Sequence, residues 1–501
     1  MTDDRFDLLI VGGGINGAGI ARDAAGRGLG VLLVEQDDLA AHTSSASTGL
    51  IHGGLRYLEH GAFRLVRESL IERSRLQAIA PHVIRPLRFV VPPPGGMRPD
   101  WLIRLGLFIY DHLGPRGNLP ASARVTLDGR LGAPLRNAGG HAFAYSDCIV
   151  DDARLTVLNA MDAAERGAVI RPRTRFLGAA RIGNVFKAHL RDRRTGERTE
   201  ISARAIVNAA GPWVRRVAES VAGATRERPP RLVKGSHLVV TRRYEGDHAY
   251  LFQNTDGRVM FAIPHGEAFT LIGTTDVPFH GDPSAPRIDS AEIAYLCEQA
   301  SRQFREPISS KDIVSSYSGV RPLYDDGSAE PSRVTRDYVL QLDAARGPQL
   351  LSIFGGKITT YRRLAERALR MLAPGLGCMA DPWTHRQPLP GGDFGDIADL
   401  SSRLRSGWPF LTPALAMRLA RSYGTRAERL IGDARALADL GPDVGGGLTL
   451  REIDYLVRHE WAMTPEDILW RRSRLGLQAS PEAREAIRRH VMGDAVTLLA
   501  D

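Results

Sequence analysis

The segment at residues 7–35 constrains the fold more than any other part of the chain. Two short apolar runs are joined there by an alanine-rich stretch, and glycines stand at Gly12, Gly14 and Gly17 after the first run. The second apolar run ends at Glu35. A G-x-G-x-x-G pattern between a strand and a helix is typical of a βαβ unit whose helix N-terminus binds a pyrophosphate. The segment therefore predicts a Rossmann-type dinucleotide site.

Each residue of this pattern has a physical task. Gly12 permits a tight turn, Gly14 lets the backbone approach a pyrophosphate, and Gly17 lets the helix lie close to the strand. Glu35 can accept hydrogen bonds from the hydroxyls of an adenosine ribose, whereas it would repel a 2'-phosphate. The sequence thus disfavours NADP as the dinucleotide.

The composition limits the class of protein. The chain has 501 residues, enough for two or three domains with buried cores. Cys148, Cys297 and Cys378 form no CxxC spacing, which argues against a disulfide framework and against a metal site. No apolar run reaches the roughly 20 residues that span a bilayer, and the first predicted strand leaves no room for a signal peptide before it. We expect a cytoplasmic protein without a metal.

The charge points to an anionic partner. The formal net charge is +9, which suits a nucleic acid, an acidic lipid surface or a phosphorylated substrate. The sequence contains no helix-turn-helix, RNP-type or zinc pattern. We therefore expect no nucleic-acid partner, and a basic nucleic-acid-binding protein remains only as a remote alternative.

The order of the segments predicts the domain organisation. Nucleotide-type segments recur at 7–54, 206–214 and 350–363, and short strand-like runs broken by Gly, Pro and Asp fill much of the interval 215–345. Such interleaving is typical of a flavoprotein, because NAD enzymes usually confine the cofactor to one contiguous domain. We predict an α/β fold: a Rossmann-type FAD-binding domain interleaved with an antiparallel β-sheet substrate domain, followed by a helical C-terminal domain. The expected parts are FAD-binding at 1–75, mixed at 76–205, an FAD-binding strand at 206–214, substrate-binding at 215–345, FAD-binding at 346–387 and helical at 388–501.

Several motifs along the whole chain carry a family resemblance. They include GGGINGAGIARDAAGRG, TSSASTGLIHGGLRYLE, IVNAAGPWV, KGSHLVV, YSGVRPL, FGGKITTYR and HEWAMTPEDILWRR. With these motifs the sequence resembles the FAD-dependent glycerol-3-phosphate dehydrogenases of the aerobic respiratory type, within the D-amino-acid-oxidase-like flavoproteins. The resemblance implies that C2 of sn-glycerol 3-phosphate gives a hydride to flavin N5, which yields dihydroxyacetone phosphate, and that membrane quinone takes the electrons. An oxidase that passes electrons to O2, acting on glycerol phosphate or on an amino or hydroxy acid, is the alternative.

The same motifs imply the cofactor site. Its expected residues are Gly12, Gly14, Asn16, Gly17, Glu35, Ser44, Ser45, Ser47, His52, Gly53, Gly54, Ala210, Gly211, Gly355, Gly356, Lys357 and Thr359.

A phosphorylated substrate needs cations and its oxidation needs a base. The expected substrate-binding residues are Arg56, Tyr57, Arg321, Arg336 and Lys357. We predict His237 as the base, because an imidazole titrates close to working pH, and Arg321 as a group that polarises the reacting oxygen. His52 is the competing base, although its place after the pyrophosphate loop favours a cofactor role.

A short apolar segment suggests a membrane contact. Residues 98–112 predict a helix too short to span a bilayer, with Trp101 to Tyr110 mostly apolar and arginines on both sides. We expect a peripheral protein on an anionic membrane surface, at the inner face of the cell membrane; a buried core helix is the alternative reading. A homodimer is compatible with the sequence.

Overall fold

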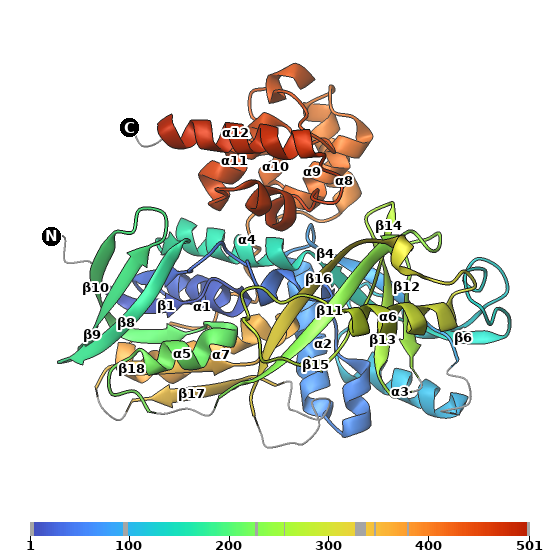
Figure 1. Ribbon diagram of the computed structural model, residues 1–501, viewed down its shortest axis with the longest axis horizontal. Coiled ribbons are helices and arrows are strands. Elements are labelled where there is room, and N and C mark those ends of the chain that lie inside the picture. Colours follow the sequence, from blue (N-terminus) through green and yellow to red (C-terminus); the bar gives the residue numbers. More distant parts are fainter. Residues whose placement is uncertain are drawn as a thin grey trace.

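The computed structural model describes residues 5–93, 99–225, 229–254, 256–325, 337–344, 347–377 and 380–497. Two β-sheets with flanking helices form the larger part, and a group of helices from the C-terminal region lies against it at the top of Figure 1. This architecture confirms the predicted fold class.

The first sheet, here called the nucleotide sheet, combines strands from distant parts of the chain. In spatial order its strands are β17 (Val339–Asp343), β18 (Gln349–Phe354), β10 (Arg198–Asn208), β1 (Arg5–Val11), β2 (Val31–Val34) and β7 (Val169–Arg171). Strand β10 also pairs with β9 (Val185–Asp192), which in turn pairs with β8 (Thr174–Ile182). Strands β18, β10, β1, β2 and β7 run parallel, whereas β17 is antiparallel to β18. Both faces are buried, as expected for a parallel sheet.

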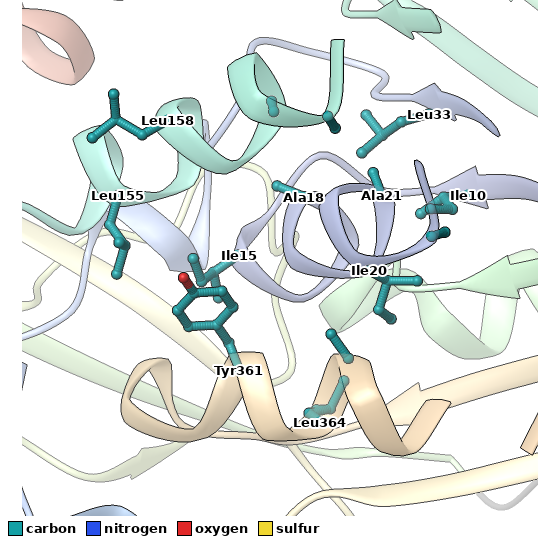
Figure 2. Packing of buried hydrophobic residues seen from close by; sticks show 14 of the residues in the cluster. Ile10, Ile15, Ala18, Ile20, Ala21, Leu33, Leu155, Leu158, Tyr361 and Leu364 are labelled. Atoms are coloured by element: carbon teal, nitrogen blue, oxygen red, sulfur yellow. The ribbon is translucent and has the colours of Figure 1, made fainter. Parts of the chain in front are cut away.

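Three helices cover one face of the nucleotide sheet, and the other face is covered by β8, β9 and a short helix. The helices are α1 (Ile15–Gly26), α4 (Asp152–Glu165), α7 (Tyr361–Leu376) and, on the other face, α5 (Val214–Glu219). Small residues of α1 let its neighbours approach: a Cβ at Gly19 would lie 2.6 Å from the ring of Tyr361. Figure 2 shows α4, with Leu155 and Leu158, on one side of α1, and Tyr361 and Leu364 of α7 on the other.

The second sheet, here called the substrate sheet, is mainly antiparallel. Its strands in spatial order are β15 (Val277–Pro278), β11 (Arg231–Thr241), β14 (Phe269–Gly273), β13 (Val259–His265), β12 (Ala249–Gln253), β4 (Ile84–Val91), β6 (His141–Val150) and β3 (Leu50–Ile51). In addition, β16 (Ile313–Leu323) pairs with β11, and β5 (Ala123–Thr126) pairs with β6. Helix α6 (Ser290–Gln303) covers one face, and α2 (Phe63–Ile79) and α3 (Asp100–Leu113) cover the other.

The C-terminal helices have a core of their own. They are α8 (Ile397–Gly407), α9 (Pro413–Tyr423), α10 (Arg426–Ile431), α11 (Leu450–Glu460), a π-helical segment (Asp467–Arg472) and α12 (Pro481–Thr497). Buried ion pairs attach them to the nucleotide sheet: both terminal nitrogens of Arg472 contact Asp38, at 2.7 and 2.8 Å, and Arg154 pairs with Glu460. Because removing one partner of a buried pair costs about 3–5 kcal/mol, these contacts fix the helices in place.

The sheets depart from the expected segment boundaries at three places. The strand expected at 206–214 is β10, which begins at Arg198 and ends at Asn208. The substrate sheet takes β4 and β6 from the part expected to be mixed, and β17, expected in the substrate part, joins the nucleotide sheet. β4 and β6 pair with each other across about sixty residues, so local patterns could not reveal their sheet. β17 pairs with the next strand, β18, and it belongs to the nucleotide sheet because β18 does.

Among the described residues, no helix is both long and apolar enough to cross a membrane.

His82 gives the folded protein a specific sensitivity to acid. Its ring is buried, both nitrogens lack a hydrogen-bond partner among the described residues, and the ring of Phe394 lies 6.2 Å away. Burial, aided by the nearby Arg154 guanidinium, lowers the pKa of His82 to about 3. In the unfolded chain the pKa of His82 is about 6.5. Acid therefore protonates this histidine more readily in the unfolded chain, and this favours the unfolded state.

We therefore predict that His82→Met raises resistance to acid. The contribution of His82 to stability is complete above about pH 6.5, and as the pH falls from there toward the folded-state pKa it is lost at about 1.4 kcal/mol per pH unit. Methionine does not titrate and fills a similar volume, so the acid unfolding midpoint should move to lower pH, measured by far-UV circular dichroism. His189→Met, at an exposed site, is the control. An unchanged midpoint in His82→Met would show that another group controls acid unfolding.

Candidate active site

A cavity of about 500 Å³ lies between the two sheets. Its wall begins at Gly12 and Gly14, after the carboxyl end of β1, and continues to Gly235 of β11 and Arg321 of β16. Ligands of open α/β sheets bind outside the carboxyl ends of the strands. The cavity can thus hold a dinucleotide that extends from the nucleotide sheet toward the substrate sheet.

The three glycines of the first turn have different tasks. Gly12 has a φ of +116°, and a Cβ there would lie 2.4 Å from the Ala209 carbonyl oxygen. A Cβ at Gly17 would lie 1.9 Å from the Gly12 carbonyl oxygen. At Gly14, by contrast, a Cβ would meet only the Ser44 side chain, with its hydroxyl at 3.0 Å. The fold itself requires Gly12 and Gly17, whereas Gly14 leaves room in the cavity for a ligand.

The adenosine end of the cavity centres on Glu35. Its two carboxylate oxygens accept the N–H of Gly13 at 2.7 Å and of Asp37 at 2.9 Å. Burial raises the pKa of Glu35, and these two N–H groups oppose the shift. A carboxylate offers about four acceptor positions, so Glu35 can accept ribose hydroxyls in addition. Next to it, a hydrogen bond from His42 at 2.9 Å lowers the pKa of Asp37.

The middle of the cavity joins three distant segments. The His52 N–H donates to the Thr359 hydroxyl at 3.2 Å, and the Asn16 amide donates to the Gly355 carbonyl at 3.3 Å. The Asn16 Oδ1 is buried without a hydrogen-bond partner among the described residues, and both Asn16 and Gly356 line the cavity.

The far end of the cavity is cationic. Arg321 pairs there with Asp276 and reaches the Thr274 hydroxyl at 3.4 Å. A Cβ at Gly235 would lie 2.7 Å from Nη2 of Arg321, so the glycine lets the guanidinium cross β11. Lys357 lies over the ring of Tyr57, 4.9 Å from its centre. Arg321, Lys357 and Tyr57 all line the cavity.

His237 does not line the cavity, although sequence reasoning predicted it as the base. Its ring is buried in the substrate sheet, stacked on Tyr317 with 4.8 Å between ring centres. Nε2 lies 3.0 Å from the Thr48 hydroxyl, and Thr48 does line the cavity. In this structure Thr48, and not His237, therefore forms the wall of the cavity at this point.

Most of the other predicted site residues meet at the cavity. Those that line it are Gly12, Gly14, Asn16, Glu35, Ser44, Ser47, His52, Tyr57, Ala210, Gly211, Arg321, Gly355, Gly356, Lys357 and Thr359. Those absent from its lining are Gly17, Ser45, Gly53, Gly54, Arg56 and His237. Gly17 and Gly54 instead make room for neighbours, and Ser45 donates to the His42 carbonyl at 3.3 Å. Arg336 lies outside the described residues.

Sequence reasoning missed several lining residues. Among them are Thr48, Trp213, Arg216, Gly235 and Thr274. Thr48 and Gly235 belong to the TSSASTGL and KGSH motifs, so the motifs were a usable signal, but only the fold shows which side chains point inward.

The loop that carries Ser47 and Thr48 is held by a buried carboxylate. Oδ2 of Asp152 accepts the Ser47 hydroxyl at 2.6 Å and the Ser47 N–H at 3.1 Å. Oδ1 of Asp152 pairs with Arg474 of the C-terminal region, whose Nε also donates to Asp151 at 3.1 Å. The C-terminal helices thereby support one wall of the cavity.

We predict that Gly14→Val yields a folded protein without a bound dinucleotide. The Cβ meets only the Ser44 side chain, and a β-branched residue at a helix N-cap costs about 1 kcal/mol, so the fold should survive. The methyl groups of the valine would occupy space next to the helix N-terminus. Flavin absorbance after purification and circular dichroism measure the two effects. Gly407→Val, at a position with open space, should keep the ligand, and full flavin content in Gly14→Val would contradict this use of Gly14.

Two families match the chain. Residues 7–362 match the family described as FAD dependent oxidoreductase, and residues 382–495 match the C-terminal domain of alpha-glycerophosphate oxidase.

Individual relatives match over nearly the full length. The chain is 51% identical to a glycerol-3-phosphate dehydrogenase of Pseudomonas aeruginosa, over 98% of this chain and 95% of that protein. It is 49% identical to a D-erythritol 1-phosphate dehydrogenase of Brucella abortus, over 96% and 97%. Among solved structures, a glycerol-3-phosphate dehydrogenase from Bacillus halodurans complexed with FAD superimposes with a TM-score of 0.72 at 28% identity, over 94% of this chain and 86% of that one.

The cavity fits the cofactor that these matches imply. The space at Gly14, the carboxylate of Glu35 and the unpartnered Oδ1 of Asn16 are suited to a bound dinucleotide. The chain therefore uses FAD, and it belongs to the FAD-dependent oxidoreductases, within the glycerol-3-phosphate dehydrogenase family.

Proposed function

We propose that this enzyme oxidises sn-glycerol 3-phosphate to dihydroxyacetone phosphate. The observation that carries the proposal is one continuous cavity with a dinucleotide end at Gly14 and Glu35 and a cationic end at Arg321 and Lys357. When FAD is bound, it supplies the acceptor for the hydride, and so for the two electrons, that leave C2. The hydroxyl on C2 must lose a proton in the same oxidation, so a proton acceptor is required beside the cavity.

The cationic end suits a phosphate. The Arg321 guanidinium can give two parallel N–H donors to phosphate oxygens, and Lys357 adds a compact positive charge. Arg321 is held by Asp276, so its position is set before a ligand arrives. The ring of Tyr57 lies below Lys357 and restricts where its ammonium can go.

The test is anaerobic bleaching of the flavin by candidate substrates. sn-Glycerol 3-phosphate should bleach it, whereas glycerol, which lacks the phosphate, should not. D-Erythritol 1-phosphate is included because the Brucella abortus relative is named for it; bleaching by that compound alone would assign the longer substrate and reject our proposal.

We predict that Arg321→Lys weakens substrate binding by tenfold or more. A point charge replaces a guanidinium fork, and tenfold corresponds to about 1.4 kcal/mol. Titration of flavin absorbance with sn-glycerol 3-phosphate gives the Kd, and flavin content should stay unchanged. Arg302→Lys, an exposed arginine that pairs with Glu298 at 2.6 Å, is the matched control. A Kd equal to that of the wild type would remove Arg321 from the phosphate site.

We propose membrane quinone as the electron acceptor and α3 as the membrane contact. Four large apolar side chains of α3 are exposed: Trp101 (65%), Phe108 (59%), Leu105 (46%) and Leu102 (43%). Only the opposite side of the helix is buried, through Leu107 and Tyr110. This exposure argues against the alternative of a buried core helix. In Figure 1, α3 lies on the side of the molecule away from the C-terminal helices.

The surroundings of α3 suit an anionic lipid surface. Arg104 on α3, and Arg64 and Arg67 on the adjacent α2, are exposed. Each arginine near an anionic surface contributes about 1 kcal/mol, and apolar side chains at the acyl boundary add to this. Binding should therefore weaken, without disappearing, as salt is raised.

We predict that Trp101→Glu with Phe108→Glu releases the protein from vesicles that contain anionic lipid. Flavin reduction by substrate should survive, because the cavity lies elsewhere, while electron transfer to quinone in the vesicles should fall. The matched control is Leu437→Glu with Met492→Glu, which changes two side chains exposed to 47% and 63% on the C-terminal helices. Flotation measures binding. Equal release by both double variants would reject α3 as the specific contact.

A separate assay tests the electron acceptor. Rapid O2 consumption by the wild-type enzyme without quinone would favour the oxidase alternative.

A further inference from the structure

Thr48 separates the buried His237 from the cavity. The Thr48 hydroxyl lies 3.0 Å from Nε2 of His237, and Thr48 lines the cavity together with Arg321. On its other sides the imidazole is confined: Tyr317 stacks on it, and a Cβ at Gly273 would lie 2.3 Å from its Cδ2. The ring is therefore fixed in one place, with Thr48 between it and a ligand.

The hydrogen bond at Nε2 gives His237 one route along which a proton can arrive. Nδ1 is buried without a hydrogen-bond partner among the described residues, so Nε2 is the nitrogen with a partner. Burial lowers the pKa of His237 to about 3, and the positive charge of the Arg321 guanidinium is the second cause of this shift. The ring is thus neutral near pH 7. The relay uses the neutral tautomer that carries its proton on Nδ1, in which Nε2 accepts the Thr48 hydroxyl hydrogen.

Binding of the proposed substrate would make His237 more basic. One of the two leading causes of its low pKa is the charge of Arg321. A phosphate dianion paired with Arg321 would offset that charge, and the pKa of His237 would rise toward its ordinary value. The histidine would then accept a proton in the complex more readily than in the free enzyme.

We propose that Thr48 is a catalytic residue that relays the substrate proton to His237. This inference rests on the proposed oxidation of sn-glycerol 3-phosphate. The C2 hydroxyl gives its proton to Oγ of Thr48, and the Thr48 hydroxyl hydrogen passes to Nε2 of His237. The C2–H bond breaks as hydride leaves to FAD, and the C2–O bond becomes a carbonyl. The alcohol thereby loses one proton and one hydride, and Thr48 ends as it began.

The test is the rate of flavin reduction by sn-glycerol 3-phosphate in rapid mixing experiments without oxygen. Thr48→Val, which has nearly the same shape, should slow the reduction by about 10²- to 10³-fold, within the usual contribution of a positioned base. Thr48→Ser keeps the hydroxyl and should restore most of the rate. Flavin content and the Kd for substrate should change little in either variant.

The control removes a comparable hydroxyl from the same sheet. Thr270 of β14 is buried and accepts the Arg243 N–H at 3.1 Å. Gly273 of the same strand pairs with His237 and so shares its face of the sheet. Because side chains alternate between faces, Thr270, three residues before Gly273, points to the opposite face. Thr270→Val should reduce the flavin at the wild-type rate. If Thr48→Val loses FAD, Thr48→Ala, which only removes atoms, takes its place.

Two readouts distinguish a relay from a purely structural hydrogen bond. In mixtures of H₂O and D₂O, a relay that moves both hydrogens in one step gives a curved dependence of the wild-type rate on deuterium content. His237→Ala should also slow the reduction, and the double variant with Thr48→Val should be no slower than the slower single variant.

Three outcomes would overturn the relay. These are a wild-type rate in Thr48→Val, a failure of Thr48→Ser to restore the rate, or effects of Thr48→Val and His237→Ala that multiply in the double variant. A failure of the proposed function looks different, because the wild-type flavin would then remain oxidised with sn-glycerol 3-phosphate before any variant is compared.

Discussion

The close approach of Gly17 to the Gly12 carbonyl is the contact on which the cofactor half of the molecule depends. With no side chain at either position, α1 begins directly beside the end of β1, and its first residues line the cavity. The small residues farther along α1 then let α4 and α7 approach from both sides, as Figure 2 shows. One local packing requirement thus positions the anion-binding helix terminus and the helices that enclose it.

The C-terminal helices contribute to the site without lining the cavity. The loop at 43–48 crosses from the nucleotide sheet to the substrate sheet with only a short 3₁₀ turn at Thr43–Ser45. Asp152 holds this loop through Ser47, and Arg474 neutralises Asp152 from the other side. A buried carboxylate without a cation is costly, so the C-terminal region stabilises the wall that contains Thr48. This gives the helical region a physical reason to accompany the catalytic part of the chain.

Local sequence patterns predicted those features that arise from nearby residues. The glycine turn and the position of Glu35 after β2 follow from a segment of about thirty residues, in which the spacing alone determines the geometry. The interleaving of nucleotide-type segments predicted the fold class. The sheet to which β4 and β6 belong could not be predicted, because these strands pair with each other across a long stretch of sequence. β17 pairs locally with β18, and its short strand pattern did not show that this pair lies in the nucleotide sheet. Motif membership likewise placed Ser45 and Arg56 at the site, while their orientation depends on turns that the motif does not specify.

His237 shows the same limit at the level of one side chain. Residue type and motif predicted a base at this position, but the register of β11 with β14 and β16 places the imidazole against Tyr317 and behind Thr48. Burial keeps the ring neutral in the free enzyme, and the nearby Arg321 adds to that effect. The cation that we propose to bind the phosphate is therefore also the cation that depresses the basicity of the histidine. Substrate binding would relieve that depression, so in the proposed mechanism recognition of the phosphate and activation of the proton acceptor would be one electrostatic event.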